Sequence, residues 1–223
     1  MGQLHDFSKL VRSKKELLLC IFITLLVQIG ISIYTMKWDQ KHHILGTESS
    51  FMSIIGILIV LFGLIYTMIK PGLPFITREL LFGIFSIIVG LLLSQMIHYI
   101  NDPQVVETAA IATMVNFGLM LLLGFIIVYF KYDLEWMGMF LFTALLVIIV
   151  SRLFSLFSKN SREINRNISV VAVVIFSLYI LYDTNNILLK YKNKDSIDCI
   201  KGALDYYLDI WNLFSDYLDI KSK

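Results

Sequence analysis

The chain has 223 residues, of which 57% are hydrophobic and 16% are charged, and its formal net charge is +2. Soluble proteins carry roughly 25% charged residues, so the composition excludes an ordinary soluble domain and indicates a membrane protein with several spans. The small net charge and the lack of a basic stripe argue against nucleic acid as a partner, and leave the lipid bilayer as the expected surroundings.

A basic tail, residues 1–16, precedes the first apolar run. That run is about as long as the ~20 residues that cross a bilayer, and it lacks a small-residue cleavage site, so we expect a retained span. Similar runs predict six spans in all, at about 17–36, 51–69, 80–100, 107–130, 137–157 and 167–189. We expect residues 1–223 to form one polytopic all-α membrane domain, a bundle of six to seven transmembrane helices. The seventh helix, at 202–220, either spans the membrane or re-enters it.

The lysines and arginines of the short loops predict the orientation of the spans. With the N-terminus in the cytosol, eleven of these residues lie in the tail and the cytosolic loops, and five lie in the opposite loops. We therefore expect a cytosolic N-terminus. The two lysines after 202–220 slightly favour re-entry of that helix, because re-entry returns them to the cytosol.

The last helix carries a stripe of acidic and amide side chains in an otherwise apolar segment. Its members are spaced four, three, four and three residues apart: Asp205, Asp209, Asn212, Asp216 and Asp219. At 3.6 residues per turn they share one face of a helix. An unpaired charge in hydrocarbon costs several kcal/mol, so this face needs water, a cation or a partner.

Three further positions invite interpretation. Asp183 either lies at the interface and pairs with a loop lysine, or faces the last helix and approaches Asp205 or Asp209, where two carboxylates form a proton-sensitive latch or a site for a hard cation. Arg152 interrupts the fifth span and either pairs inside the membrane or extends to the interface. The two cysteines, Cys20 and Cys199, are interpreted as free thiols, since two cysteines make no disulfide framework.

No motif for phosphate, dinucleotide, zinc or an activated serine occurs, so we expect no enzymatic activity and no cofactor. Tyr182-Asp183 matches one element of intramembrane aspartyl proteases, but the second element that such a protease needs does not occur.

Residues 180–184 read Ile-Leu-Tyr-Asp-Thr, and residues 203–214 read Ala-Leu-Asp-Tyr-Tyr-Leu-Asp-Ile-Trp-Asn-Leu-Phe. These two segments of the C-terminal third resemble the Bax inhibitor motif family of membrane proteins. Among its branches the chain looks closest to the Golgi anti-apoptotic proteins and their viral relatives. The resemblance implies six outer helices around a central seventh. It also implies a proton-sensitive calcium leak in Golgi or endoplasmic reticulum membranes that lowers store calcium and restrains cell death.

The paired pore aspartates of that family correspond to Asp183 and Asp209, which the resemblance makes the pH-sensing pair and a transient calcium site. Asp205 stands where relatives usually have asparagine. The arginine that latches the pair in some members has no clear match, and Lys70, Arg78 and Arg152 are the candidates. The alternative function is a non-conducting adaptor that acts on cell death or calcium release by binding other intracellular membrane proteins.

Overall fold

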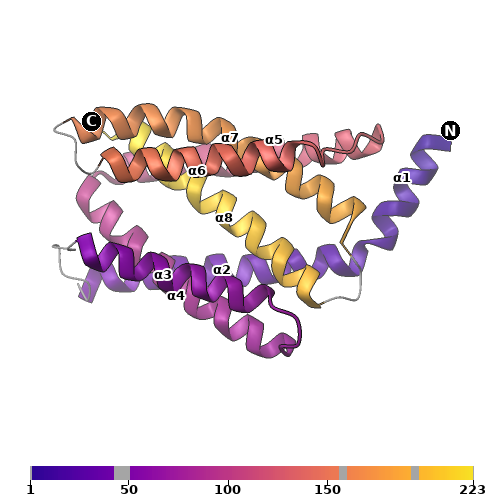
Figure 1. Cartoon of the computed structure of the whole chain (residues 1–223), viewed down its shortest axis with the longest axis horizontal. Coiled ribbons are helices and arrows are strands. Elements are labelled where there is room, and N and C mark those ends of the chain that lie inside the picture. Colours follow the sequence, from indigo (N-terminus) through magenta and orange to yellow (C-terminus); the bar gives the residue numbers. More distant parts are fainter. Residues whose placement is uncertain (1, 43–50, 156–159, 192–195, 223) are drawn as a thin grey trace. The chain divides into compact units, whose positions relative to one another are not determined.

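The computed structural model describes residues 2–42, 51–155, 160–191 and 196–222. Within these ranges the chain forms helices and no strands, as the sequence predicts (Figure 1). The helices are α1 (Gly2–Ser13), α2 (Lys15–His42), α3 (Phe51–Ile69), α4 (Phe75–Ile100), α5 (Pro103–Tyr129), α6 (Met137–Ser155), α7 (Ser161–Leu189) and α8 (Ser196–Lys221).

Local sequence sets the boundary between α4 and α5. Asn101 ends α4 in the left-handed conformation, with φ of 49°, which asparagine tolerates better than most residues. Asp102 then caps α5, because its side chain accepts hydrogen bonds from the backbone N–H groups of Gln104 and Val105. Pro103 occupies the first turn of α5, where its missing N–H has no helical partner to lose.

Five helices in the described ranges are long and apolar enough to cross a membrane: α2, α4, α5, α6 and α7. The predicted span 51–69 is α3, whose described apolar part is the shorter segment Gly56–Ile69. The protein is therefore a polytopic helical membrane protein. The last two residues of the predicted span 137–157 lie outside the described ranges.

The predicted tail contains a helix, α1, that the sequence analysis did not anticipate. The Phe7 ring of α1 packs edge-on against Tyr129, with ring centroids 5.5 Å apart. Asp6 Oδ2 lies 3.1 Å from Lys131 Nζ at the surface. The signal was present in the sequence, since Phe7, Leu10 and Val11 are spaced three and four residues apart, as on one face of a helix.

The helices group into two packed units. The first, here called the α5–α7 unit, holds α1, α5, α6, α7 and the part of α8 from Leu208 onward. The second, the α2–α4 unit, holds α2, α3, α4 and α8 up to Tyr207. The central position of α8 that the resemblance implies stays a prediction, as does the organisation of the chain as one domain.

In the α2–α4 unit, α2 and α4 approach closely at a glycine. A Cβ added to Gly90 would lie 2.6 Å from the Ser32 carbonyl oxygen, so only glycine fits there. Tyr207 of α8 packs in the same unit, with its ring centroid 5.2 Å from that of Phe82 and 5.9 Å from that of Phe85. The Tyr207 hydroxyl also lies 2.5 Å from Ser32 Oγ.

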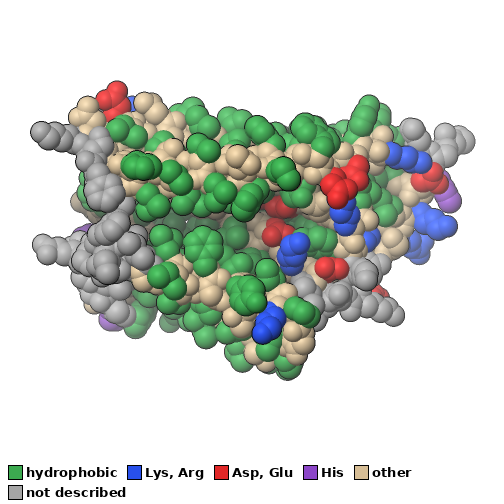
Figure 2. Space-filling view, in the orientation of Figure 1, with side chains coloured by type: hydrophobic (Ala, Val, Ile, Leu, Met, Phe, Trp, Pro, Cys, Tyr) green, Lys and Arg blue, Asp and Glu red, His purple; other side chains and the backbone are tan. Residues whose placement is uncertain are grey.

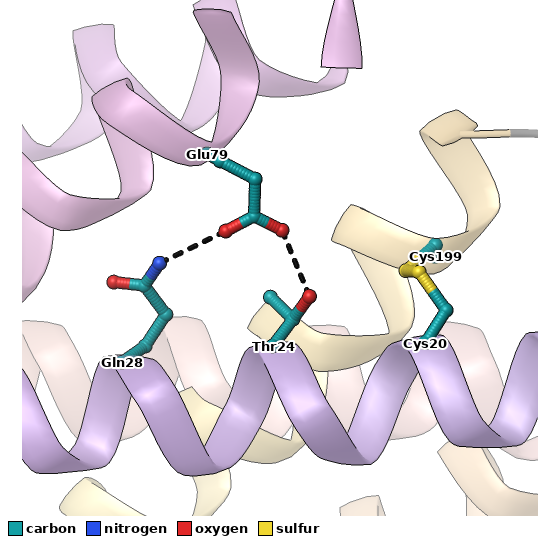
Figure 3. The surroundings of a disulfide bond; sticks show 5 residues. All are labelled: Cys20, Thr24, Gln28, Glu79 and Cys199. Atoms are coloured by element: carbon teal, nitrogen blue, oxygen red, sulfur yellow. Dashed lines mark hydrogen bonds between the residues drawn. A yellow bond between two sulfur atoms is a disulfide. The ribbon is translucent and has the colours of Figure 1, made fainter. Parts of the chain in front are cut away.

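Cys20 of α2 and Cys199 of α8 form a disulfide bond, so their interpretation as free thiols was wrong (Figure 3). Their Cα atoms are 5.9 Å apart, within the range that a disulfide requires. The sequence could not reveal the pair, because 179 positions separate the two residues and each lies in its own helix.

Apolar side chains cover most of the face seen in Figure 2. Large hydrophobic residues are exposed along the apolar helices, including Phe62 and Tyr66 of α3 and Leu119 and Leu122 of α5. In water such a surface would be an association site, but in a bilayer it is the expected contact with lipid tails.

Candidate functional site: buried carboxylates on α7 and α8

The α5–α7 unit buries the acidic side chains of the predicted site. Asp183 of α7 is 8% exposed, and Asp209 and Asp216 of α8 are 3% and 1% exposed. Asp219, two residues before the end of α8, is half-buried. A helix with these carboxylates turned inward cannot present them all to water, so partners inside the unit have to stabilise them.

Arg152 of α6 lies against two of these carboxylates. Its Nη2 donates to Asp216 Oδ1, and its Nη1 lies 3.6 Å from Asp219 Oδ2. Ser169 of α7 bridges the group, since its hydroxyl accepts from Arg152 Nη2 at 3.2 Å and donates to Asp219 Oδ2 at 3.1 Å. Of the two interpretations that the sequence allowed, the geometry therefore places Arg152 in an ion-paired cluster.

Asp183 and Asp209 share a neighbour, Tyr179. The Tyr179 phenol lies one turn before Asp183 on α7, and both carboxylates act on it electrostatically. The residues that follow Asp183 on α7, from Thr184 to Leu188, are buried as well. The C-terminal end of α7 thus brings a polar segment into the unit.

Two oxygens near this site lack a hydrogen-bond donor among the described residues. They are Asn186 Oδ1 and Asp216 Oδ2, and both are buried. A buried oxygen without a donor is costly, and a proton or a cation satisfies it. No group of three or more metal-ligating His, Cys, Asp or Glu side chains occurs in the part of the chain that the structure describes.

Comparison with known proteins identifies the family. Residues 10–221 match the sequence profile described as "Inhibitor of apoptosis-promoting Bax1". The chain belongs to the Bax inhibitor family. It is 44% identical over 91 residues to the uncharacterized protein Cj0236c of Campylobacter jejuni, 32% identical over 141 residues to Protein LIFEGUARD 4 of Arabidopsis thaliana, and 29% identical over 183 residues to Bax inhibitor 1 of Schizosaccharomyces pombe.

These matches cover 40%, 63% and 82% of this chain, and 37%, 56% and 63% of the respective relatives. The chain therefore spans less than two thirds of the length of each of these relatives. The Bax inhibitor family is not enzymatic, in agreement with the prediction from the sequence. The relatives do not resolve the branch, so the placement beside Golgi and viral members stays a prediction.

Three of the predicted residues, Asp205, Lys70 and Arg78, belong to the α2–α4 unit. The buried Arg78 guanidinium donates to the backbone carbonyl of Met68 at the end of α3, and to those of Lys70 at 2.6 Å and Leu73 at 3.1 Å in the loop that follows. A cation at a helix C-terminus is favourable, so Arg78 has a structural role in this fold. Asn212 turns back on α8 and donates to the Leu208 carbonyl at 2.8 Å.

Sequence reasoning missed a second buried polar group, in the α2–α4 unit. Thr24 Oγ1 and Gln28 Nε2 of α2 donate to the two oxygens of Glu79 on α4, at 2.8 and 3.1 Å (Figure 3). Ser86 of α4 donates to Gln28 Oε1 at 2.9 Å. The available signal was the spacing of Thr24, Gln28 and Ser32, which recur every four residues in an apolar span.

It also missed an amide in α5. Asn116 Nδ2 donates to Ser177 Oγ of α7 and to the Tyr217 hydroxyl of α8, both at 2.9 Å. An isolated asparagine in an apolar run gives no indication of its partners, so only the packed helices reveal this contact.

Proposed function

We propose that this Bax inhibitor family protein conducts cations through its membrane as a pH-modulated, calcium-permeable leak. Asp183 and Asp209 are the carboxylates to which we assign cation entry and proton sensing. Family membership already implies a membrane protein connected with apoptosis or calcium. The proposal adds an activity and a site.

The observation that carries the proposal is the concentration of carboxylates in one unit. Those of Asp183, Asp209, Asp216 and Asp219 lie on α7 and α8, three of them buried, and the Arg152 guanidinium contacts Asp216 and Asp219. Buried carboxylates attract cations, and calcium prefers oxygen ligands of this kind.

Protonation supplies the pH dependence. Asp183 and Asp209 both act electrostatically on Tyr179, and we propose that they also repel each other, so that a proton on one removes the repulsion. The protonated and ionised pairs then favour different packings of α7 and α8, which is a two-state element biased by local charge.

The organelle is not part of the proposal. The resemblance implies Golgi or endoplasmic reticulum, but similar proteins also occur in Campylobacter jejuni and Helicobacter pylori, and bacteria have neither organelle. We propose the same activity for whichever membrane holds the chain, with lowered store calcium and restrained cell death as its consequence in a eukaryotic cell.

The test is calcium release from sealed liposomes that contain only the purified full chain, scanned from about pH 6 to 8. We expect pH-dependent release that is lost in the Asp183→Asn/Asp209→Asn variant and kept in Glu107→Gln, which removes an exposed carboxylate of α5. Release in the double variant equal to that of the unchanged chain would overturn the site. No release from folded protein at any pH would overturn the leak and favour the adaptor.

A further inference from the structure

The Cys20–Cys199 disulfide joins two helices near the same end of the α2–α4 unit. Cys20 is the sixth residue of α2, about 8 Å along the axis from Lys15, and Cys199 is the fourth residue of α8. Cys20, Thr24 and Gln28 follow one another at four-residue intervals on the same side of α2 (Figure 3). The bond therefore ties the first turn of α8 to the face of α2 that binds Glu79.

The charged residues around both cysteines predict that this end of the unit faces the cytosol. Lys9, Arg12, Lys14 and Lys15 precede Cys20, and Lys190, Lys192, Lys194 and Lys201 flank Cys199. Clusters of this kind mark the cytosolic side of a membrane protein. Glutathione and thioredoxin keep cytosolic thiols reduced, and a disulfide found there is most often transient or redox-sensing.

Cys20 is the more exposed of the two cysteines. Cys20 is partly exposed, whereas Cys199 is only 3% exposed. Exchange requires access to one sulfur, and attack at Cys20 Sγ makes Cys199 the leaving thiolate.

Other contacts hold α8 in the unit when the bond is open. Two turns after Cys199, Tyr206 stacks on Phe22 with ring centroids 6.0 Å apart, and Tyr207 packs among Phe82 and Phe85. Reduction therefore frees the first turns of α8 without removing the helix from the unit.

We propose that Cys20 and Cys199 form a reversible thiol–disulfide exchange site for small cytosolic thiols of the glutathione class. A thiolate attacks Cys20 Sγ, forms a mixed disulfide there and expels the Cys199 thiolate, which takes up a proton. A second thiolate attacks the sulfur of the bound small thiol and releases Cys20 as a thiol. Two small thiols are thereby oxidised to one disulfide, and the protein gains two electrons and two protons. Oxidised glutathione reverses the sequence.

The test counts free thiols in the purified full chain, reconstituted in liposomes and equilibrated with reduced and oxidised glutathione in varied ratio. Because the chain has two cysteines, tagging with a polymer-linked maleimide gives zero, one or two tags. We expect a transition from zero to two tags at intermediate ratios. Two tags at every ratio, or zero tags in reduced glutathione alone, would overturn the proposal. Cys20→Ser and Cys199→Ser are the controls and cannot take two tags.

Sidedness and conformation provide two independent readings. Glutathione added outside sealed liposomes should reduce only molecules whose N-terminal tail is outside, as judged by protease cleavage of the tail. Reduction confined to the opposite orientation would refute the cytosolic position.

Amide hydrogen exchange at residues 196–203 should be roughly ten-fold faster in the reduced chain, with α5 unchanged. Equal rates in both forms would refute the release of α8. None of these measurements depends on the proposed calcium leak.

Discussion

Arg152 of α6 donates a hydrogen bond to the carboxylate of Asp216 on α8, 64 positions further along the chain. The Asp216 side chain is 1% exposed and that of Arg152 is 35% exposed, so the pair lies where an apolar helix meets the inside of its unit. Removing one member of such a pair leaves a buried charge without compensation.

Arg152→Ala should therefore destabilise the protein by on the order of 3 kcal/mol, because the Asp216 carboxylate loses its counter-ion. Thermal unfolding in detergent, monitored by the helical circular dichroism signal, measures the effect. Arg166→Ala, which removes an exposed arginine of α7, serves as the control and should change little. Adding Asp216→Asn to Arg152→Ala should restore part of the loss, and a strictly additive double variant would contradict the pairing.

Gly124→Ala should destabilise the contact between α5 and α7. An added Cβ would lie 2.8 Å from Thr184 Cβ and Cγ2, so the helices must move apart at a cost of about 1–3 kcal/mol. Gly118→Ala on the same helix meets no atom within 4 Å, and should be neutral or stabilising by up to about 1 kcal/mol through helix propensity. Equal unfolding temperatures for the two variants would contradict the close approach.

Gln28→Leu should lower the free energy of unfolding by on the order of 2 kcal/mol. The substitution removes the donor to Glu79 Oε2 and the acceptor for the Ser86 hydroxyl, and leaves both groups without that partner. The neighbouring Val27→Leu, on the exposed side of α2, is the matched control. Chemical denaturation of the two variants in the same detergent compares them, and a Gln28→Leu variant as stable as its control would argue against the network.

Tyr207→Phe distinguishes the contribution of the Tyr207 hydroxyl to stability from that of its ring. The variant loses the hydrogen bond with Ser32 but keeps the ring contacts with Phe82 and Phe85, so we expect a loss of about 1 kcal/mol. Tyr207→Ala also empties the ring site and should cost about 3–5 kcal/mol. If the two variants unfold at the same temperature, the ring contributes nothing and the packing of this part of α8 is misassigned.

Most of the fold could be predicted from the sequence, because spanning helices are a local property of the chain. An apolar run of about 20 residues must satisfy its backbone hydrogen bonds internally in a bilayer, so length and hydropathy suffice to place it. The run 51–69 coincides with the bounds of α3, and the acidic segment 202–220 lies within α8. The family was likewise readable from residues 180–184 and 203–214.

The partners of the polar residues were decided only by tertiary structure. The sequence left two interpretations of Arg152 open, because its contact with Asp216 depends on the packing of α6 against its neighbours. It gave no sign that Cys20 meets Cys199, since 179 positions separate them. Helix periodicity determines which residues share a face of one helix. Close packing between helices decides which face of one helix contacts which face of another, and that packing involves residues distant in the chain.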